Sequence, residues 1–216
     1  MSATGETTAL QHHFDSMEQQ RDTSTLGMWT FVAQEVMFFG GLFTAYLVYR
    51  VLHPKAFEIG SAHLDIWLGG INTAVLIASS FTMAMAVWAA QTGRRKQIGH
   101  FLVATLILGS VFLGIKAYEY NHKWHEHLVP GSHFALDSPY EDNVELFFCL
   151  YFAMTGMHAL HMVIGVGLLL WFIVKAYKGR FTPEYSHPVE IFGLYWHFVD
   201  IVWIFLFPLL YLLGRH

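Results

Sequence analysis

Five long apolar stretches constrain this chain more than any other feature. Each is at least about 20 residues long, the length that an α-helix needs to cross the hydrocarbon core of a bilayer. The stretches cover residues 27–50, 66–90, 98–119, 144–174 and 189–213. Only 13% of the residues are charged, about half the share typical of a soluble domain. We therefore predict an all-α fold, an integral membrane bundle of five transmembrane helices.

The rest of the chain is short and polar. Residues 1–25 form an N-terminal tail of mixed charge that lacks the pattern of a signal peptide, and residues 26–214 form a single membrane domain. Basic residues gather after the second and fourth spans: Arg94, Arg95, Lys96, Lys175, Lys178 and Arg180. Because short cytoplasmic loops are enriched in such residues, we predict a cytoplasmic N-terminus and an external C-terminus.

Small residues recur every four positions along the second span. They are Ala74, Ala78, Thr82, Ala86 and Ala90. Small side chains allow helix backbones to approach closely in lipid. We expect this stripe to be a helix-packing face.

Several ionisable side chains fall within the spans, where each costs a few kcal/mol unless it is paired or hydrated. They are Glu35 in the first span, His158 and His161 in the fourth, and Glu190, His197 and Asp200 in the fifth. Helical spacing places His158 and His161 on one face, and Glu190, His197 and Asp200 on another. One interpretation is that these groups pair with each other inside the bundle, for example a histidine of the fourth span with a carboxylate of the fifth. The other is a proton relay or a lipid pocket.

Enzymatic sites are not indicated by the residues alone. Histidines of the fourth and fifth spans could ligate a haem or a metal, but the ligand set is incomplete. There is no phosphate-binding loop or nucleophile motif, and a net charge of −4 gives no basic field for nucleic acid. We predict no catalytic, cofactor-binding or metal-binding residues in this chain.

Five sequence segments together resemble subunit III of the haem-copper terminal oxidases. They are GMWTFVAQEVMFF at 27–39, NTAVL at 72–76, AYEY at 117–120, TGMHALH at 155–161 and YWHFVDIVW at 195–203. The resemblance runs in order from about residue 26 to residue 214. It implies a subunit without a redox centre that packs on the catalytic subunit I, alongside subunit II. Haem and copper are expected in those partner subunits, which reduce oxygen to water and pump protons.

The resemblance also assigns roles to residues. Glu35 takes the place of the membrane-buried carboxylate beside a lipid-binding region, and Glu35, Trp29 and Trp196 are the expected phospholipid contacts. The two histidines of the fourth span and Glu190, His197 and Asp200 take the places of polar positions on the last two helices. Many members have two further helices at the N-terminus. This chain resembles the five-helix bacterial form, which implies a bacterial plasma membrane.

Other functions remain open at this point. The oxidase could use cytochrome c, the commoner donor, or quinol, and an accessory protein of nitric oxide reductase has a similar set of helices. An independent b-type cytochrome would use His158, His161 and His197 as ligands. A proton-coupled carrier built around Glu35 ranks last, because inverted repeats and broken helices are not evident.

Overall fold

The computed structural model describes residues 10, 14–131, 134–136 and 138–213. This part of the chain contains helices and no strands, and five of its helices are long and apolar enough to cross a membrane. The predicted five-helix membrane bundle is therefore confirmed. In chain order the long helices are α1 (Met17–Leu52), α3 (Ile66–Gln91), α4 (Arg95–His125), α5 (Glu141–Tyr177) and α6 (His187–Phe207).

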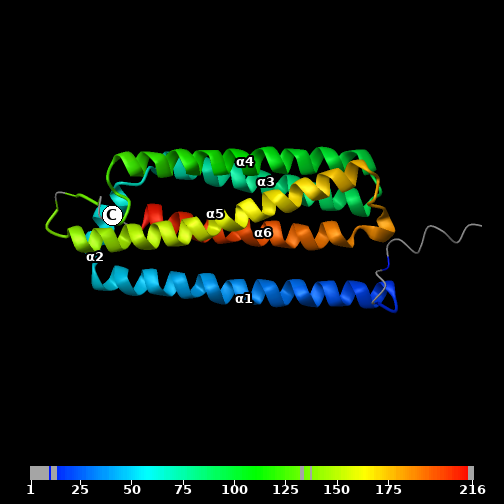
Figure 1. Cartoon of the computed structure of the whole chain (residues 1–216), viewed down its shortest axis with the longest axis horizontal. Coiled ribbons are helices and arrows are strands. Elements are labelled where there is room, and N and C mark those ends of the chain that lie inside the picture. The colour runs from blue at the N-terminus through cyan, green and yellow to red at the C-terminus, as the bar shows by residue number, and fades with distance from the viewer. Residues whose placement is uncertain (1–9, 11–13, 132–133, 137, 214–216) are drawn as a thin grey trace, which may run out of the picture.

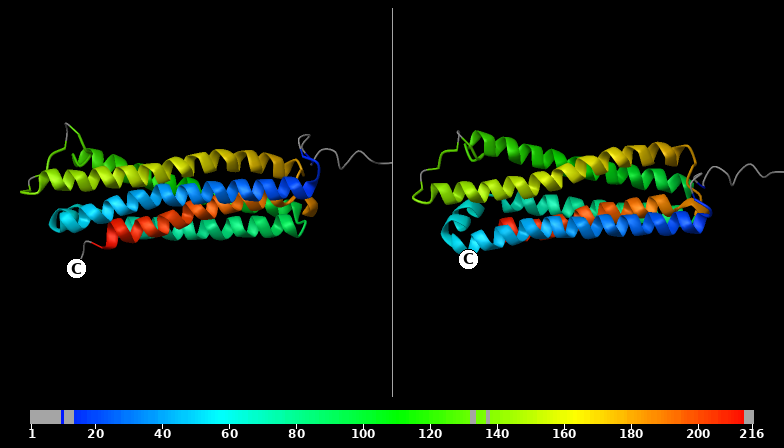
Figure 2. Two further views of the ribbon diagram at one scale, coloured as in Figure 1. Left: turned by 90° about the horizontal axis from the view of Figure 1, so that it is seen from below. Right: turned by 60° about the horizontal axis from the view of Figure 1, so that its bottom comes forward.

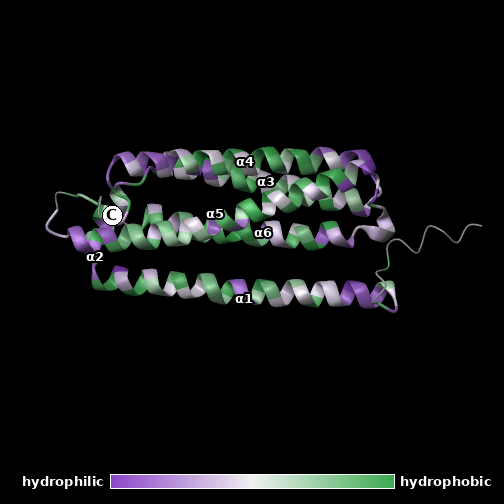
Figure 3. Cartoon of the chain, in the orientation of Figure 1, coloured by the Kyte–Doolittle hydropathy of each residue, from purple (hydrophilic) through white to green (hydrophobic). Residues whose placement is uncertain are grey.

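The long helices lie side by side in an elongated bundle (Figure 1). Helices α3 and α4 form the most extensive contact, α6 packs against α3, α5 and α1, and α1 lies at the edge of the bundle (Figures 1 and 2). The start of α1 and the end of the described chain are at opposite ends (Figure 1). Hydrophilic residues gather at the helix ends and hydrophobic ones along the middle (Figure 3), as a membrane-spanning bundle requires.

Two features at the helix ends differ from the sequence expectation. Helix α1 begins at Met17 rather than near residue 27, and the Ser16 Oγ atom caps it by accepting a hydrogen bond of 3.1 Å from the Gln19 amide. The first joint, predicted only as a turn, folds into the short helix α2 (Pro54–Ala62). Proline suits the first turn of a helix because its missing N–H is not needed there.

Helix α6 does not end at Pro208 but continues as a wider helical turn, η3 (Pro208–Leu212). The Leu213 amide donates to the Pro208 carbonyl at 3.2 Å, a five-residue step that is typical of a π-helix. Proline has no N–H to donate, so the regular pattern must change at this point. The widened turn carries Tyr211 into the interior, where its side chain is fully buried.

The predicted stripe of small residues on α3 does not form one packing face. Ala86 and Ala90 are buried, whereas Ala74 and Ala78 are exposed. Each step of four residues advances about 40° beyond a full turn of an α-helix. Over the length of the stripe this drift turns it from the outer surface to the interior. The expectation was therefore right for the second half of α3 and wrong for the first.

Candidate functional site

Glu35 of α1 and His161 of α5 form a pair across the interface between these helices. His161 Nε2 lies 3.3 Å from Glu35 Oε2, and the Glu35 side chain is largely buried, with a relative exposure of 7% for the residue. This contact agrees with the interpretation that the buried polar groups pair with each other, but the example of a pair between the fourth and fifth spans does not occur among the described residues. The carboxylate partner of His161 comes from the first span instead.

A backbone hydrogen bond orients the His161 ring within this pair. His161 Nδ1 lies 2.8 Å from the Met157 carbonyl oxygen, and a carbonyl can only accept, so Nδ1 is the donor. This bond turns Nε2 toward the carboxylate of Glu35. The pair thus brings two polar side chains of α1 and α5 together inside the membrane domain.

His158 lies one turn before His161 but contacts different helices. Its ring packs edge-on against Phe112 of α4, with 5.4 Å between centroids, and lies 5.2 Å from Trp203 of α6. Its Nε2 atom is buried without a hydrogen-bond partner among the described residues. The two histidines lie on one side of α5, as their spacing predicts, but they contact different residues.

The most connected polar cluster was not predicted. Lys116 Nζ of α4 donates to Glu119 Oε2 at 2.8 Å and to the Tyr211 hydroxyl at 2.7 Å. Tyr151 and Tyr211 in turn donate to Glu119 Oε1, at 2.9 and 2.5 Å. Lys116 Nζ also lies 4.5 Å from the ring centre of Trp203. The sequence does contain a pattern that predicts part of this cluster. A lysine and a glutamate three positions apart within an apolar span lie on the same helix face and can pair.

His197 and Asp200 of α6 line a small pocket beside α3, as their shared helical face predicts. Ser80 of α3 completes its polar floor, with Oγ 2.7 Å from His197 Nδ1. Glu190 does not join them. It lies near the start of α6, where Oε1 accepts hydrogen bonds from Gln91 at 3.1 Å and Ser186 at 2.8 Å.

The two tryptophans expected to contact lipid lie in contrasting environments. Trp29 is 58% exposed on α1, whereas Trp196 is 1% exposed. The Trp196 indole fills the space beside Gly109 and Gly165 and donates to Ser79 Oγ at 3.0 Å. Trp196 therefore packs in the core and does not reach lipid, which corrects that expectation on steric grounds.

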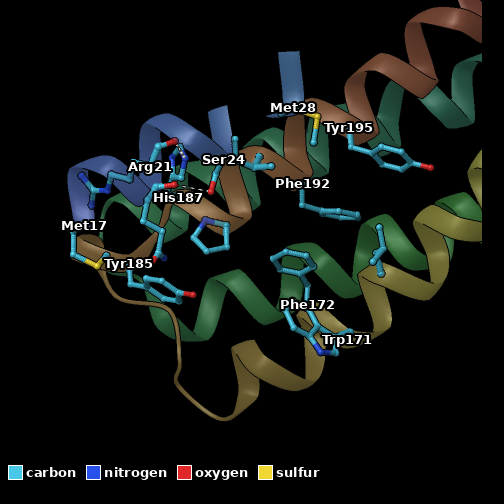
Figure 4. Close-up of a pocket in the computed structure, with 14 residues that line it drawn as sticks. Met17, Arg21, Ser24, Met28, Trp171, Phe172, Tyr185, His187, Phe192 and Tyr195 are labelled. Atoms are coloured by element: carbon cyan, nitrogen blue, oxygen red, sulfur yellow. Dashed lines mark hydrogen bonds between the residues drawn. The ribbon is translucent and has the colours of Figure 1, made fainter. Parts of the chain in front are cut away.

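A cavity of about 340 Å³ opens at the end of the bundle where α1 and α6 begin (Figure 4). Arg21, Ser24 and His187 lie at one end of it, and His187 Nε2 is 3.2 Å from the Arg21 carbonyl oxygen. The opposite end has apolar walls formed largely by Trp171, Phe172, Phe192 and Tyr195. The cavity is therefore polar near the membrane surface and apolar deeper in the bundle.

The described residues hold no group of three or more histidine, cysteine, aspartate or glutamate side chains arranged for a metal ion. Haem ligation by His161 through Nε2 would require Glu35 to move, because its carboxylate lies in front of that atom. The arrangement suits helix packing and the binding of amphiphiles.

Comparison with known proteins identifies close sequence relatives. A profile of the family described as cytochrome c oxidase subunit III matches residues 4–215. Cytochrome c oxidase subunit 3 of Thermostichus vulcanus is 33% identical over 202 residues, covering 93% of this chain and 92% of the relative. Quinol oxidase subunit 3 of Bacillus spizizenii is 32% identical over 207 residues, covering 92% of each chain. Cytochrome c oxidase subunit 3 of a Synechocystis species is 34% identical, covering 89% of this chain and 76% of the relative.

Proposed function

Because the chain belongs to the cytochrome c oxidase subunit III family, we propose that it is the non-catalytic third subunit of an aerobic terminal oxidase in a bacterial plasma membrane. It packs on the catalytic subunit I, alongside subunit II, and these partners carry the haem and copper with which oxygen is reduced to water and protons are pumped. The observation that carries this proposal is the family match over residues 4–215.

The preferred electron donor is cytochrome c. Relatives of nearly equal similarity are named as subunits of cytochrome c oxidase and of quinol oxidase. A quinol oxidase is therefore the second candidate, and oxygen consumption by the purified complex with reduced cytochrome c or with a quinol as the donor distinguishes the two.

The chain contributes to turnover through the position of its polar groups. The Glu35–His161 pair lies at the interface between α1 and α5, with 3.3 Å between Glu35 Oε2 and His161 Nε2. We assign it a supporting role in proton uptake by the catalytic subunit. The rest of the bundle provides an apolar flank that stabilises the catalytic subunit during turnover.

Phospholipid is a further expected partner. The cavity beside α1 pairs the cationic Arg21 with apolar walls that include Trp171 and Phe172. A phosphate group at the polar end and an acyl chain along the aromatic walls would match this division. Trp29, exposed nearer the middle of α1, offers a second lipid-facing contact.

The proposed orientation places the start of α1 in the cytoplasm. Successive long helices run in opposite directions, so the Lys and Arg residues that follow α3 and α5 lie at the same end of the bundle as the start of α1. Short cytoplasmic loops are enriched in such residues. The loops at the other end carry Arg50, Lys55 and Lys123, fewer than the six cations that follow α3 and α5. This asymmetry supports an external C-terminus.

The test is to purify the chain through a C-terminal tag in mild detergent and to record a visible spectrum of everything that accompanies it. We expect larger haem-bearing subunits, and a spectrum that disappears when they are stripped away. A Soret band that stays with the isolated chain would show that it is a b-type cytochrome and would overturn the proposal.

A further inference from the structure

A pocket of about 230 Å³ lies in the groove between α3 and α6. Its floor is polar and consists of Ser80, His197 and Asp200. Three branched side chains surround its mouth and are about half exposed: Ile77, Ile201 and Ile204. We call this surface the α3–α6 groove. Asp200 lies 13 residues into α6, about 20 Å from its start, close to the middle of a membrane about 30 Å thick.

Asp200 lacks the partners that a buried carboxyl group needs. Its relative exposure is 3%, and neither Oδ1 nor Oδ2 has a hydrogen-bond partner within the described residues. The nearby Ser80 hydroxyl is engaged with His197 Nδ1. A buried polar group without a hydrogen bond is costly, and the cost is greatest at membrane depth, where no bulk water can compensate.

Among the described residues, the other buried charged side chains lie within 3.3 Å of a side chain of opposite charge or of a histidine ring. Lys116 and Glu119 bond to each other and to two tyrosines, and Glu35 faces His161. Asp200 differs in facing a pocket that opens to the outside of the molecule. A donor can therefore reach it from another molecule.

The surface around the pocket is suited to a second helix. Ile77 on α3 and Ile201 and Ile204 on α6 give the mouth of the pocket an exposed apolar border against which another helix can pack. A phospholipid cannot supply the donor that Asp200 lacks, because at this depth it presents only hydrocarbon.

We propose that the α3–α6 groove seats a transmembrane helix of the catalytic subunit, and that this helix places a hydrogen-bond-donating side chain opposite Asp200. This inference rests on the proposed function and adds to it the surface and the residue that make the contact. His197, held by Ser80, borders the same pocket and restricts which side chains fit there.

Site-specific photocrosslinking in native membranes tests the contact. Ile201→p-benzoylphenylalanine places a photoreactive ring at the mouth of the pocket, and Val163→p-benzoylphenylalanine on α5 is the control, because Val163 is 56% exposed and far from the groove in sequence. We expect the probe at 201 to crosslink to the catalytic subunit. Adding Asp200→Leu, which removes the acceptor but keeps the side-chain size, should lower that crosslink about tenfold.

Two further variants separate chemistry from folding. Asp200→Asn keeps one carbonyl acceptor and should retain most of the crosslink. Ile77→Trp adds bulk at the mouth of the pocket and should weaken the crosslink, whereas Ala153→Leu on the exposed surface of α5 should not. Each variant is compared at equal yield of the tagged chain, so a misfolded protein is recognised by low yield.

The outcomes distinguish the two levels of the proposal. If the catalytic subunit co-purifies but the probe at 201 labels only lipid, or if Asp200→Leu leaves the crosslink unchanged, the α3–α6 contact is overturned and the subunit assignment stands. If no larger subunit accompanies the unaltered chain, the proposed function itself fails.

Discussion

Lys116→Met should be among the most destabilising single substitutions in this chain. Removing one partner of a buried ion pair costs about 3–5 kcal/mol, because the other charge remains buried. Here Glu119 Oε2 would lose its lysine donor, while Oε1 would keep the hydrogen bonds from Tyr151 and Tyr211. We therefore expect a loss near the lower end of that range, about 3 kcal/mol in the free energy of unfolding.

The measurement is unfolding of the purified chain in mixed micelles with increasing dodecyl sulfate, followed by tryptophan fluorescence. The fluorescence of Trp203 is sensitive to this site, since Lys116 Nζ lies over its ring. Lys55→Met, on the exposed surface of α2, is the matched control and should change stability little. The double variant Lys116→Met with Glu119→Gln removes both charges and should recover most of the loss. A double variant as unstable as the sum of the two single variants would refute the ion-pair explanation.

Three further predictions follow from the other sites. Glu35→Ala should leave assembly with the catalytic subunit intact but shorten the time for which the complex sustains oxygen consumption; failure of the subunits to co-purify would contradict this. Ser79→Ala removes the acceptor of the Trp196 indole and should lower unfolding free energy by about 1–3 kcal/mol, measurable in the same micelle titration, with no loss expected from the exposed Ala153→Ser. Trp171→Ala removes an aromatic wall of the cavity beside α1 and should reduce the phospholipid retained per chain, as measured by mass spectrometry of the purified complex; unchanged lipid content would argue against that site.

The sequence predicted the membrane helices well because their signal is local. A span is recognised from about 20 consecutive apolar residues, whatever the rest of the chain does. The helix ends were less predictable: the cap at Ser16 is a local hydrogen bond that the prediction missed, whereas the short helix α2 depends on packing against α1 and α5. Phe57 of α2, for example, is held by rings of Tyr46 and Phe147, at 5.2 and 5.4 Å between centroids.

The buried polar residues were predictable as a set but not as pairs. Glu35 and His161 were singled out by their cost in lipid, yet their pairing joins the first and fourth spans. Lys116 was missed, although its charge within an apolar span was visible. Trp196 was predicted to contact lipid, as an aromatic residue in a family motif. In the structure it lies in the core, because two glycines on neighbouring helices make room for its ring.

The sequence by itself determined that this chain crosses the membrane five times, and its motifs indicated the oxidase subunit III family, because hydropathy and local patterns do not depend on which helices touch. Only the tertiary structure decided which ionisable side chains of different helices lie next to each other. Side chains on one helix share a face by their spacing, but a partner on another helix is fixed by the order and rotation of the packed helices. Those determine that Glu35 faces His161 and that Asp200 faces an outward-opening pocket without a hydrogen-bond partner in the described part of the chain.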